Sequence, residues 1–157
     1  MPDFLASLAL FGVVVSIFLF SWNSVISNQG DFSESDQMRS EAYYTATFLV
    51  STPGYPENWN SSTVEVPGFA SSDNILKPDK LSEFRNLSYS QQKLLLQAQD
   101  YRMVFRNSSG VIELEGEPLE YGKEPENASN AVVINRNVLI DFPVERQEAE
   151  MRYVVWN

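Results

Sequence analysis

The sequence predicts an α+β protein, in which a long N-terminal hydrophobic α-helix is followed by a small globular head dominated by an antiparallel β-sheet with one or two short helices. Three observations support this fold class. Residues 4–22 form an uncharged, mostly apolar run, residues 38–49 repeat apolar side chains at helical spacing, and after residue 100 the spacing becomes the alternation of strands. We expect two domains, a helix over 1–50 and a globular head over 51–157.

The apolar run begins almost at the first residue. As a helix, residues 4–22 would be about 29 Å long, close to the ~30 Å hydrocarbon core of a bilayer. Pro2 suits the first turn of a helix, and Asp3 complements its positive end. Residues 1–3 carry no Lys or Arg, although a membrane-inserted segment normally keeps positive charge on its cytoplasmic side. We therefore expect that a basic leader preceded Met1 and has been removed.

Residues 23–50 are a polar to amphipathic extension of this helix. Two structures fit the pattern: one continuous or gently kinked helix to about residue 50, or two helices with a break at Gly30. Gly30 suits the end of a helix, and Asp31 with Glu34 would form a capping box for a second one. Pro53 disfavours helical geometry at Thr52, which predicts the end of the helical region there.

The globular head contains signals for both helices and strands. Residues 57–76 are typical of loops, residues 78–84 predict a short helix, and Ser88 or Ser90 is placed to cap another helix that runs through Ala98. Residues 107–110 form a turn signal between two alternating segments. The predicted strands are 101–106, 111–115, 131–135, 138–142 and 151–156.

Composition excludes several classes of function. The 157-residue chain has no cysteine and no histidine, and its formal charge is −10. It therefore has neither disulfides nor thiolate metal sites, and it lacks the usual general base and zinc ligand. The acidic balance argues against nucleic acid as a partner, because binding nucleic acid requires cationic patches, and we expect none. We expect no enzymatic activity, no catalytic residues, no metal site and no cofactor other than N-linked glycans.

The order of these segments resembles a type IV pilin, and in particular the archaeal type IV pilin-like family made with a class III signal peptide. The resemblance rests on the apolar N-terminal helix, on the helix end and turn at residues 49–59 (LVSTPGYPENW) and on the C-terminal strand 151–156 (MRYVVW). Bacterial type IV pilins carry a glutamate at the fifth position of the mature chain, where this chain has Leu5. Asp3 is the nearest acid, either as partner of a neighbouring α-amine or as complement of its own helix end.

The resemblance implies a partner set and a location. A membrane peptidase of the prepilin type would cleave the leader, and the subunit would stay in the membrane until pilus assembly machinery inserts it into a filament of identical subunits. The head would lie outside the cell. Transfer from lipid to a filament core exchanges one apolar environment for another, so close helix packing must favour the filament.

Small residues in the apolar run allow such packing. Gly12 and Ser16 have the small-xxx-small spacing, although a plain membrane anchor with incidental small residues is the alternative. The predicted filament-core residues are Phe4, Leu5, Leu8, Phe11, Gly12, Val15, Ser16, Leu19 and Trp22.

Four Asn-x-Ser sequons lie in the head, which is a mild excess for this composition. Either they reflect Asn- and Ser-rich turns, or they accept N-linked glycans. The candidate glycosylation sites are Asn60, Asn86, Asn107 and Asn127. Six glutamates between residues 113 and 126 suggest a solvated acidic edge more than a calcium site, because no Asp-x-Asp-x-Asp-Gly loop is present.

Together these features predict a structural subunit of an extracellular type IV-like pilus filament, serving surface adhesion and assembled by lateral packing of hydrophobic N-terminal helices. The alternative is a membrane-anchored minor pilin or surface binding protein that does not form the bulk filament. A secreted hydrolase is a third class, against which the missing His and Cys count.

Overall fold

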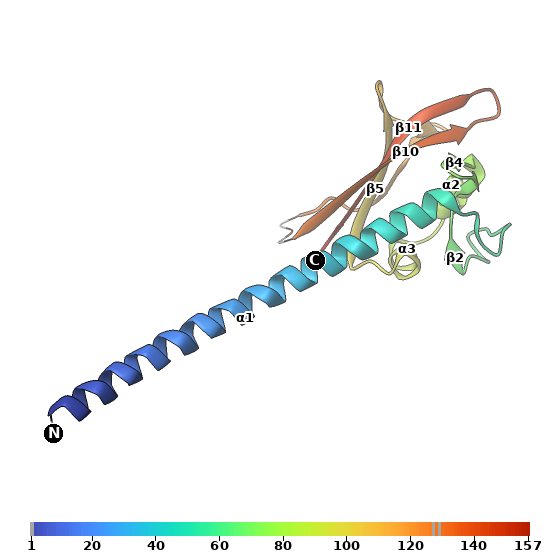
Figure 1. The fold of residues 1–157 in the computed structure, drawn as a ribbon. Helices are drawn as coiled ribbons and strands as arrows, with labels where there is room; N and C mark the ends of the chain where they lie inside the picture. Colours follow the sequence, from blue (N-terminus) through green and yellow to red (C-terminus); the bar gives the residue numbers. More distant parts are fainter. Residues whose placement is uncertain (1, 127, 129) are drawn as a thin grey trace. The chain divides into compact units, whose positions relative to one another are not determined.

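The computed structural model describes the backbone of residues 2–126, 128 and 130–157, and the side chains of residues 11–22, 35–126, 128 and 130–157. Its helices are α1 (Pro2–Ser51), α2 (Pro78–Arg85) and α3 (Tyr89–Leu96). Its strands are β1 (Gly54–Tyr55), β2 (Val66–Pro67), β3 (Ala70–Ser72), β4 (Ile75–Leu76), β5 (Asp100–Asn107), β6 (Gly110–Val111), β7 (Glu113–Leu114), β8 (Glu117–Pro118), β9 (Glu120–Gly122), β10 (Ala131–Asp141) and β11 (Arg146–Trp156) (Figure 1).

The chain divides into two compact units, Met1–Gln37 and Met38–Asn157. We call the second the head unit. It includes the last part of α1 together with all the strands and both short helices.

The helical backbone of α1 includes Gly30, as in the continuous alternative, and ends at Ser51, as the following Thr52-Pro53 predicts. The last carbonyl groups of a helix lack partners within the helix. Here the loop that follows supplies them, because Phe69 N donates to Leu49 O at 2.8 Å and Asn74 N donates to Val50 O at 2.9 Å. The end of α1 is therefore fixed to the head unit by main-chain hydrogen bonds.

Asn74 connects this helix end to the sheet. Its N–H donates to Val50 O, and its own carbonyl accepts a hydrogen bond from Leu139 N at 2.8 Å. Asn74 lies in the tight turn between β3 and β4, where it adopts a positive φ of 58°. Asparagine tolerates this conformation better than most residues.

The main sheet of the head unit has seven strands in the order β3-β4-β10-β11-β5-β6, with β9 also paired to β5. The hairpin of β10 and β11 forms its centre, and β11 pairs with β5 on its other side (Figure 1). Most pairs are antiparallel, but β4 runs parallel to β10 through Ile75 and Leu76.

Residues 131–141 form one strand, so the prediction of two separate strands there was wrong. Residues 136 and 137, which lie between the two predicted strands, continue the ladder opposite Met151 and Glu150. Alternation explains this, because successive side chains of a strand point to opposite faces. The predicted strand at 111–115 is instead divided between β6 and β7.

The two predicted short helices are confirmed as α2 and α3. Pro78 occupies the first turn of α2, where its missing N–H is harmless. Ser88 caps α3 in a capping box, in which its side chain accepts from Gln91 N and the Gln91 side chain accepts from Ser88 N. Both helices pack aromatic and aliphatic side chains against the sheet and α1, and Phe84 makes edge contacts with Phe69 and Tyr121.

The predicted fold class needs correction. Within the described residues, the exposed apolar stretch of α1 is limited to the twelve residues Phe11–Trp22, and no long apolar helix is found. Further along, α1 carries Asp36, Arg39 and Glu41, and its buried side chains face the head unit. The parallel pair in the sheet is a second difference. The described structure is thus a mixed α/β fold.

Candidate functional site

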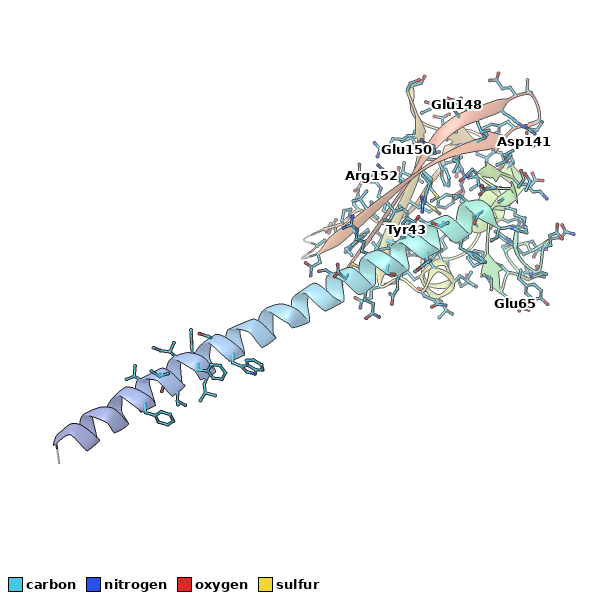
Figure 2. The ribbon with its side chains drawn as sticks, in the orientation of Figure 1. Tyr43, Glu65, Asp141, Glu148, Glu150 and Arg152 are labelled. Atoms are coloured by element: carbon cyan, nitrogen blue, oxygen red, sulfur yellow. The ribbon has the colours of Figure 1, made fainter. Side chains whose placement is uncertain are left out.

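The strongest surface feature of the described chain is the apolar segment Phe11–Trp22, which we call the apolar segment. Every side chain in it is exposed, and Phe20 reaches 80 % of its full exposure. Twelve consecutive residues make more than three helical turns, so these side chains cover all sides of the helix. Figure 2 shows side chains projecting from both sides of this part of α1.

The two small residues predicted for close packing lie inside this segment. The Ser16 hydroxyl donates to the Gly12 carbonyl at 2.8 Å, so its polar group is already satisfied within the helix. Apart from the adjoining helix backbone, a Cβ atom added at Gly12 would meet no described atom within 4 Å. The Gly12 position is therefore open to a neighbouring molecule.

The described segment contains six of the predicted filament-core residues: Phe11, Gly12, Val15, Ser16, Leu19 and Trp22. The side chains of Phe4, Leu5, Leu8 and Asp3 lie outside the described residues. Over the ranges whose side chains are described, no helix combines the length and the apolar character needed to span a membrane.

The turn at residues 53–59 is anchored by a buried tryptophan. Trp59 is 3 % exposed, and its Nε1 donates to Pro53 O at 2.9 Å and to Gly68 O at 3.0 Å. Gly68 lies so close to the backbone of Thr52 and Gly54 that a Cβ atom would come within 2.5 Å of both. This turn holds the loop after α1 in one conformation.

Lys80, which sequence reasoning missed, is a buried cation at the same turn. Its ammonium donates to the Pro53 and Glu57 carbonyl oxygens and lies 5.1 Å from the centre of the Trp59 ring. Burial, with a smaller contribution from Lys77, lowers the pKa of Lys80 below its ordinary value, and Glu57 opposes that shift. The carbonyl ligands and the ring explain how this charge is accommodated.

The described sequons differ in local conformation. At Asn60 and Asn107 the side-chain oxygen accepts a hydrogen bond from the main-chain N–H two residues on, at 2.9 Å and 2.8 Å respectively, and the serines at those positions are exposed. In these Asx turns the side-chain oxygen is engaged, and the structure gives the amide nitrogen no hydrogen bond. Asn127 lies outside the described residues.

Asn86 is in a different environment. It ends α2, Leu87 beside it is 6 % exposed, and the Ser88 hydroxyl of the sequon is engaged in the capping box of α3. The Asn86 side chain is exposed, but its sequon is fixed between two helices, whereas those at Asn60 and Asn107 lie in Asx turns.

Glycans are expected on Asn60 and Asn107 and not on Asn86. The reason is that an acceptor sequon must adopt the conformation that the glycosylating enzyme binds, and the capping box of α3 fixes Ser88 of the Asn86 sequon. Mass spectrometry of glycopeptides from the native chain measures the occupancy. Ser62→Ala and Ser109→Ala should each remove one glycan without affecting the other. Bare peptides at Asn60 and Asn107, or a glycan at Asn86, would contradict the prediction.

The acidic stretch is partly neutralised by arginines. Arg102 pairs with both Glu120 and Glu124, and Arg85 lies 3.7 Å from Glu117. Pairs this exposed contribute about 0–1 kcal/mol each. Among the described residues no group of three or more Asp or Glu side chains is arranged to hold a metal ion.

Asp100 forms a small ionic cluster at the start of β5. Its Oδ1 accepts from Lys93 Nζ at 2.8 Å and from the Tyr89 hydroxyl at 2.7 Å. The hydrogen bond from Lys93, and then that from Tyr89, lower the pKa of Asp100 below its ordinary value of 3.8. Burial, and then the hydrogen bond to Asp100, raise the pKa of Tyr89 to about 12.

Asp100→Asn should weaken the acid dependence of stability. A carboxylate whose pKa is lowered by folding stabilises the protein above its unfolded pKa, and the contribution is lost as the pH falls through the lower folded pKa. The free energy of unfolding, measured by urea denaturation between pH 5 and pH 2, should therefore fall less steeply below about pH 4 in the variant. Identical pH profiles for the variant and the parent chain would refute this role of Asp100.

A polar groove crosses the outer face of the main sheet. No local pattern predicts it, because its walls come from segments far apart in the chain. Its volume is about 860 Å³, within the range of small-ligand pockets. The strands β10 and β11 form its floor, and the turns after β3 and β5 flank it. Its polar lining includes Asn74, Arg106, Asn107, Asn137, Glu148 and Glu150.

The chain was compared with known proteins at three levels. It matches no protein-family model, no curated protein and no solved structure.

Proposed function

We propose that this chain is the structural subunit of an extracellular type IV-like pilus filament that serves adhesion. The observation that carries the proposal is the exposure of apolar side chains on every side of Phe11–Trp22. A helix segment that is apolar all round requires burial in lipid or in protein. One partner surface would cover one side of it, whereas several copies packed laterally cover every side.

The chemistry of the segment suits a filament core. The segment carries no charge, and the hydroxyl of Ser16 is satisfied within the helix. Burial among other copies therefore leaves no unpaired charge and stabilises the assembly by about 25 cal/mol per Å² of apolar surface removed from water. The open space at Gly12 allows a neighbouring helix to approach closely.

The head unit suits the outside of such a filament. It contains the four sequons and most of the acidic residues of a chain with a formal charge of −10. A high net charge of one sign keeps neighbouring filaments soluble. The proposal includes membrane-inserted storage before assembly, and a prepilin-type peptidase and assembly machinery as partners; these rest on the resemblance to archaeal pilin-like proteins.

The test is copy number at the cell surface. Fibres sheared from producing cells, stained negatively and labelled with an antibody to the head unit, should contain this chain along their whole length. Deletion of the gene should remove them, and the intact gene should restore them. Label confined to fibre tips, or chain retained at the membrane without fibres, would instead assign it to a minor pilin or a surface binding protein.

A further inference from the structure

The polar groove lies beside the sequon at Asn107. Asn107 and Ser108 line it from the turn after β5, and Asn74 lines it from the turn between β3 and β4. Glu148 and Glu150, labelled on β11 in Figure 2, lie opposite Leu139 and Asn137 of β10 in the register of the sheet. The groove therefore extends from a predicted attachment site across two strands.

The attachment atom of Asn107 is free. Its Oδ1 accepts from Ser109 N at 2.8 Å, and the structure gives its amide nitrogen no hydrogen bond. The side chain is half-buried at the rim of the groove, whereas Asn60 is exposed and does not line it. A group attached to Asn107 thus starts at the groove, and a group attached to Asn60 does not.

The lining suits sugar hydroxyl groups. Asn74 and Asn137 offer amide donors and acceptors, Glu148 and Glu150 offer acceptors, and Arg106 offers donors. Arg106 Nε is buried without a hydrogen-bond partner and lies 3.5 Å from Glu150 Oε1, which is an ion-pair distance. Half-buried Leu139 adds an apolar surface for the CH face of a sugar ring.

From this geometry we infer that Asn107 carries an N-linked glycan whose first sugars lie in the groove over β10 and β11. The glycan ties the turn after β5 to the turn between β3 and β4. The inference rests on the extracellular location in the proposed function, because N-glycosylation takes place outside the cytoplasm.

The test compares two glycans on the same folded chain. Chain recovered from the cell surface is treated with a peptide-N-glycosidase, and release from Asn107 and Asn60 is followed by mass spectrometry. Release at Asn107 should be about tenfold slower, the effect of roughly one net hydrogen bond holding the sugars in the groove. After denaturation the two rates should be equal.

Variants of the groove distinguish binding of the glycan in the groove from its covalent attachment to Asn107. Asn137→Ala combined with Glu148→Ala removes two exposed polar walls that make no hydrogen bond in the described structure, and it should raise the Asn107 release rate to that of Asn60. Asn135→Ala is the matched control, because it lies on the same face of β10 outside the groove lining. It should leave the rate unchanged.

Two results overturn the inference: equal release rates on the folded chain, or bare Asn107 beside an occupied Asn60. Either result can be obtained with fibres built of this chain. It would then refute the glycan inference and leave the filament proposal unaffected. Conversely, a protected glycan on surface chain that forms no fibres would support the inference and refute the filament.

Discussion

Gly12→Leu should reduce the yield of filaments at least about tenfold while the head unit stays folded. Beyond the adjoining helix backbone, no described atom lies within 4 Å of the Cβ position, so the chain itself leaves room where the added side chain begins. In a filament the same side chain would enter a helix contact built around a small residue. Overpacking costs about 1–3 kcal/mol per site, and each 1.4 kcal/mol is a factor of ten in association.

The measurement is the amount of fibre sheared from cells that express equal amounts of each variant. Circular dichroism of the purified chain reports whether the head unit remains folded. Val13→Leu is the matched control, because it adds bulk to the neighbouring position, which is exposed at 56 % and already carries a branched side chain. Fibres of normal number and diameter from Gly12→Leu would show that close packing at this position is not needed.

Trp59→Ala should lower the free energy of unfolding of the head unit by about 3–5 kcal/mol. The indole is buried, and its removal leaves a cavity beside Phe69. The Gly68 carbonyl would lose the hydrogen bond from Nε1, and the Lys80 ammonium would lose the ring below it. The three losses act on one cluster, so their combined effect is expected at the upper end of the range.

Urea denaturation measures this change. Trp59→Phe is the informative companion variant, because it keeps most of the ring and removes the Nε1 donor; we expect it to lose about 1–3 kcal/mol. A loss below about 1 kcal/mol for Trp59→Ala would mean that the turn is held without the indole, and that its packing contributes less than a typical buried aromatic.

Sequence patterns predicted the local elements of the head unit well. The capping box at Ser88, the proline at the start of α2 and the helix stop before Pro53 are signals carried by neighbouring residues, and all three appear in the structure. The strands β3 and β4 were missed because they are two or three residues long and depend on partners far along the chain.

The candidate sites also divide into features that local sequence predicts and features that depend on distant segments. The exposure of the apolar segment follows from its composition, but the prediction of a long hydrophobic helix went beyond what the described side chains support. The buried environment of Lys80 and the groove beside Asn107 arise from tertiary packing of the loop after α1 and of three strands, which no local spacing encodes. The constraint on the Asn86 sequon could be predicted in part, since Ser88 was a predicted helix cap.

The two main-chain hydrogen bonds of Asn74 have a mechanical consequence. Tension applied along the helix would follow the covalent chain through a loop before reaching the sheet. Asn74 provides a shorter route, because Val50 O holds its N–H and Leu139 N holds its carbonyl. A pull on the last turn of α1 would therefore reach strand β10 through the two main-chain hydrogen bonds of Asn74. The turn between β3 and β4 would thereby take part of the tension that the loop with the buried Trp59 would otherwise carry alone.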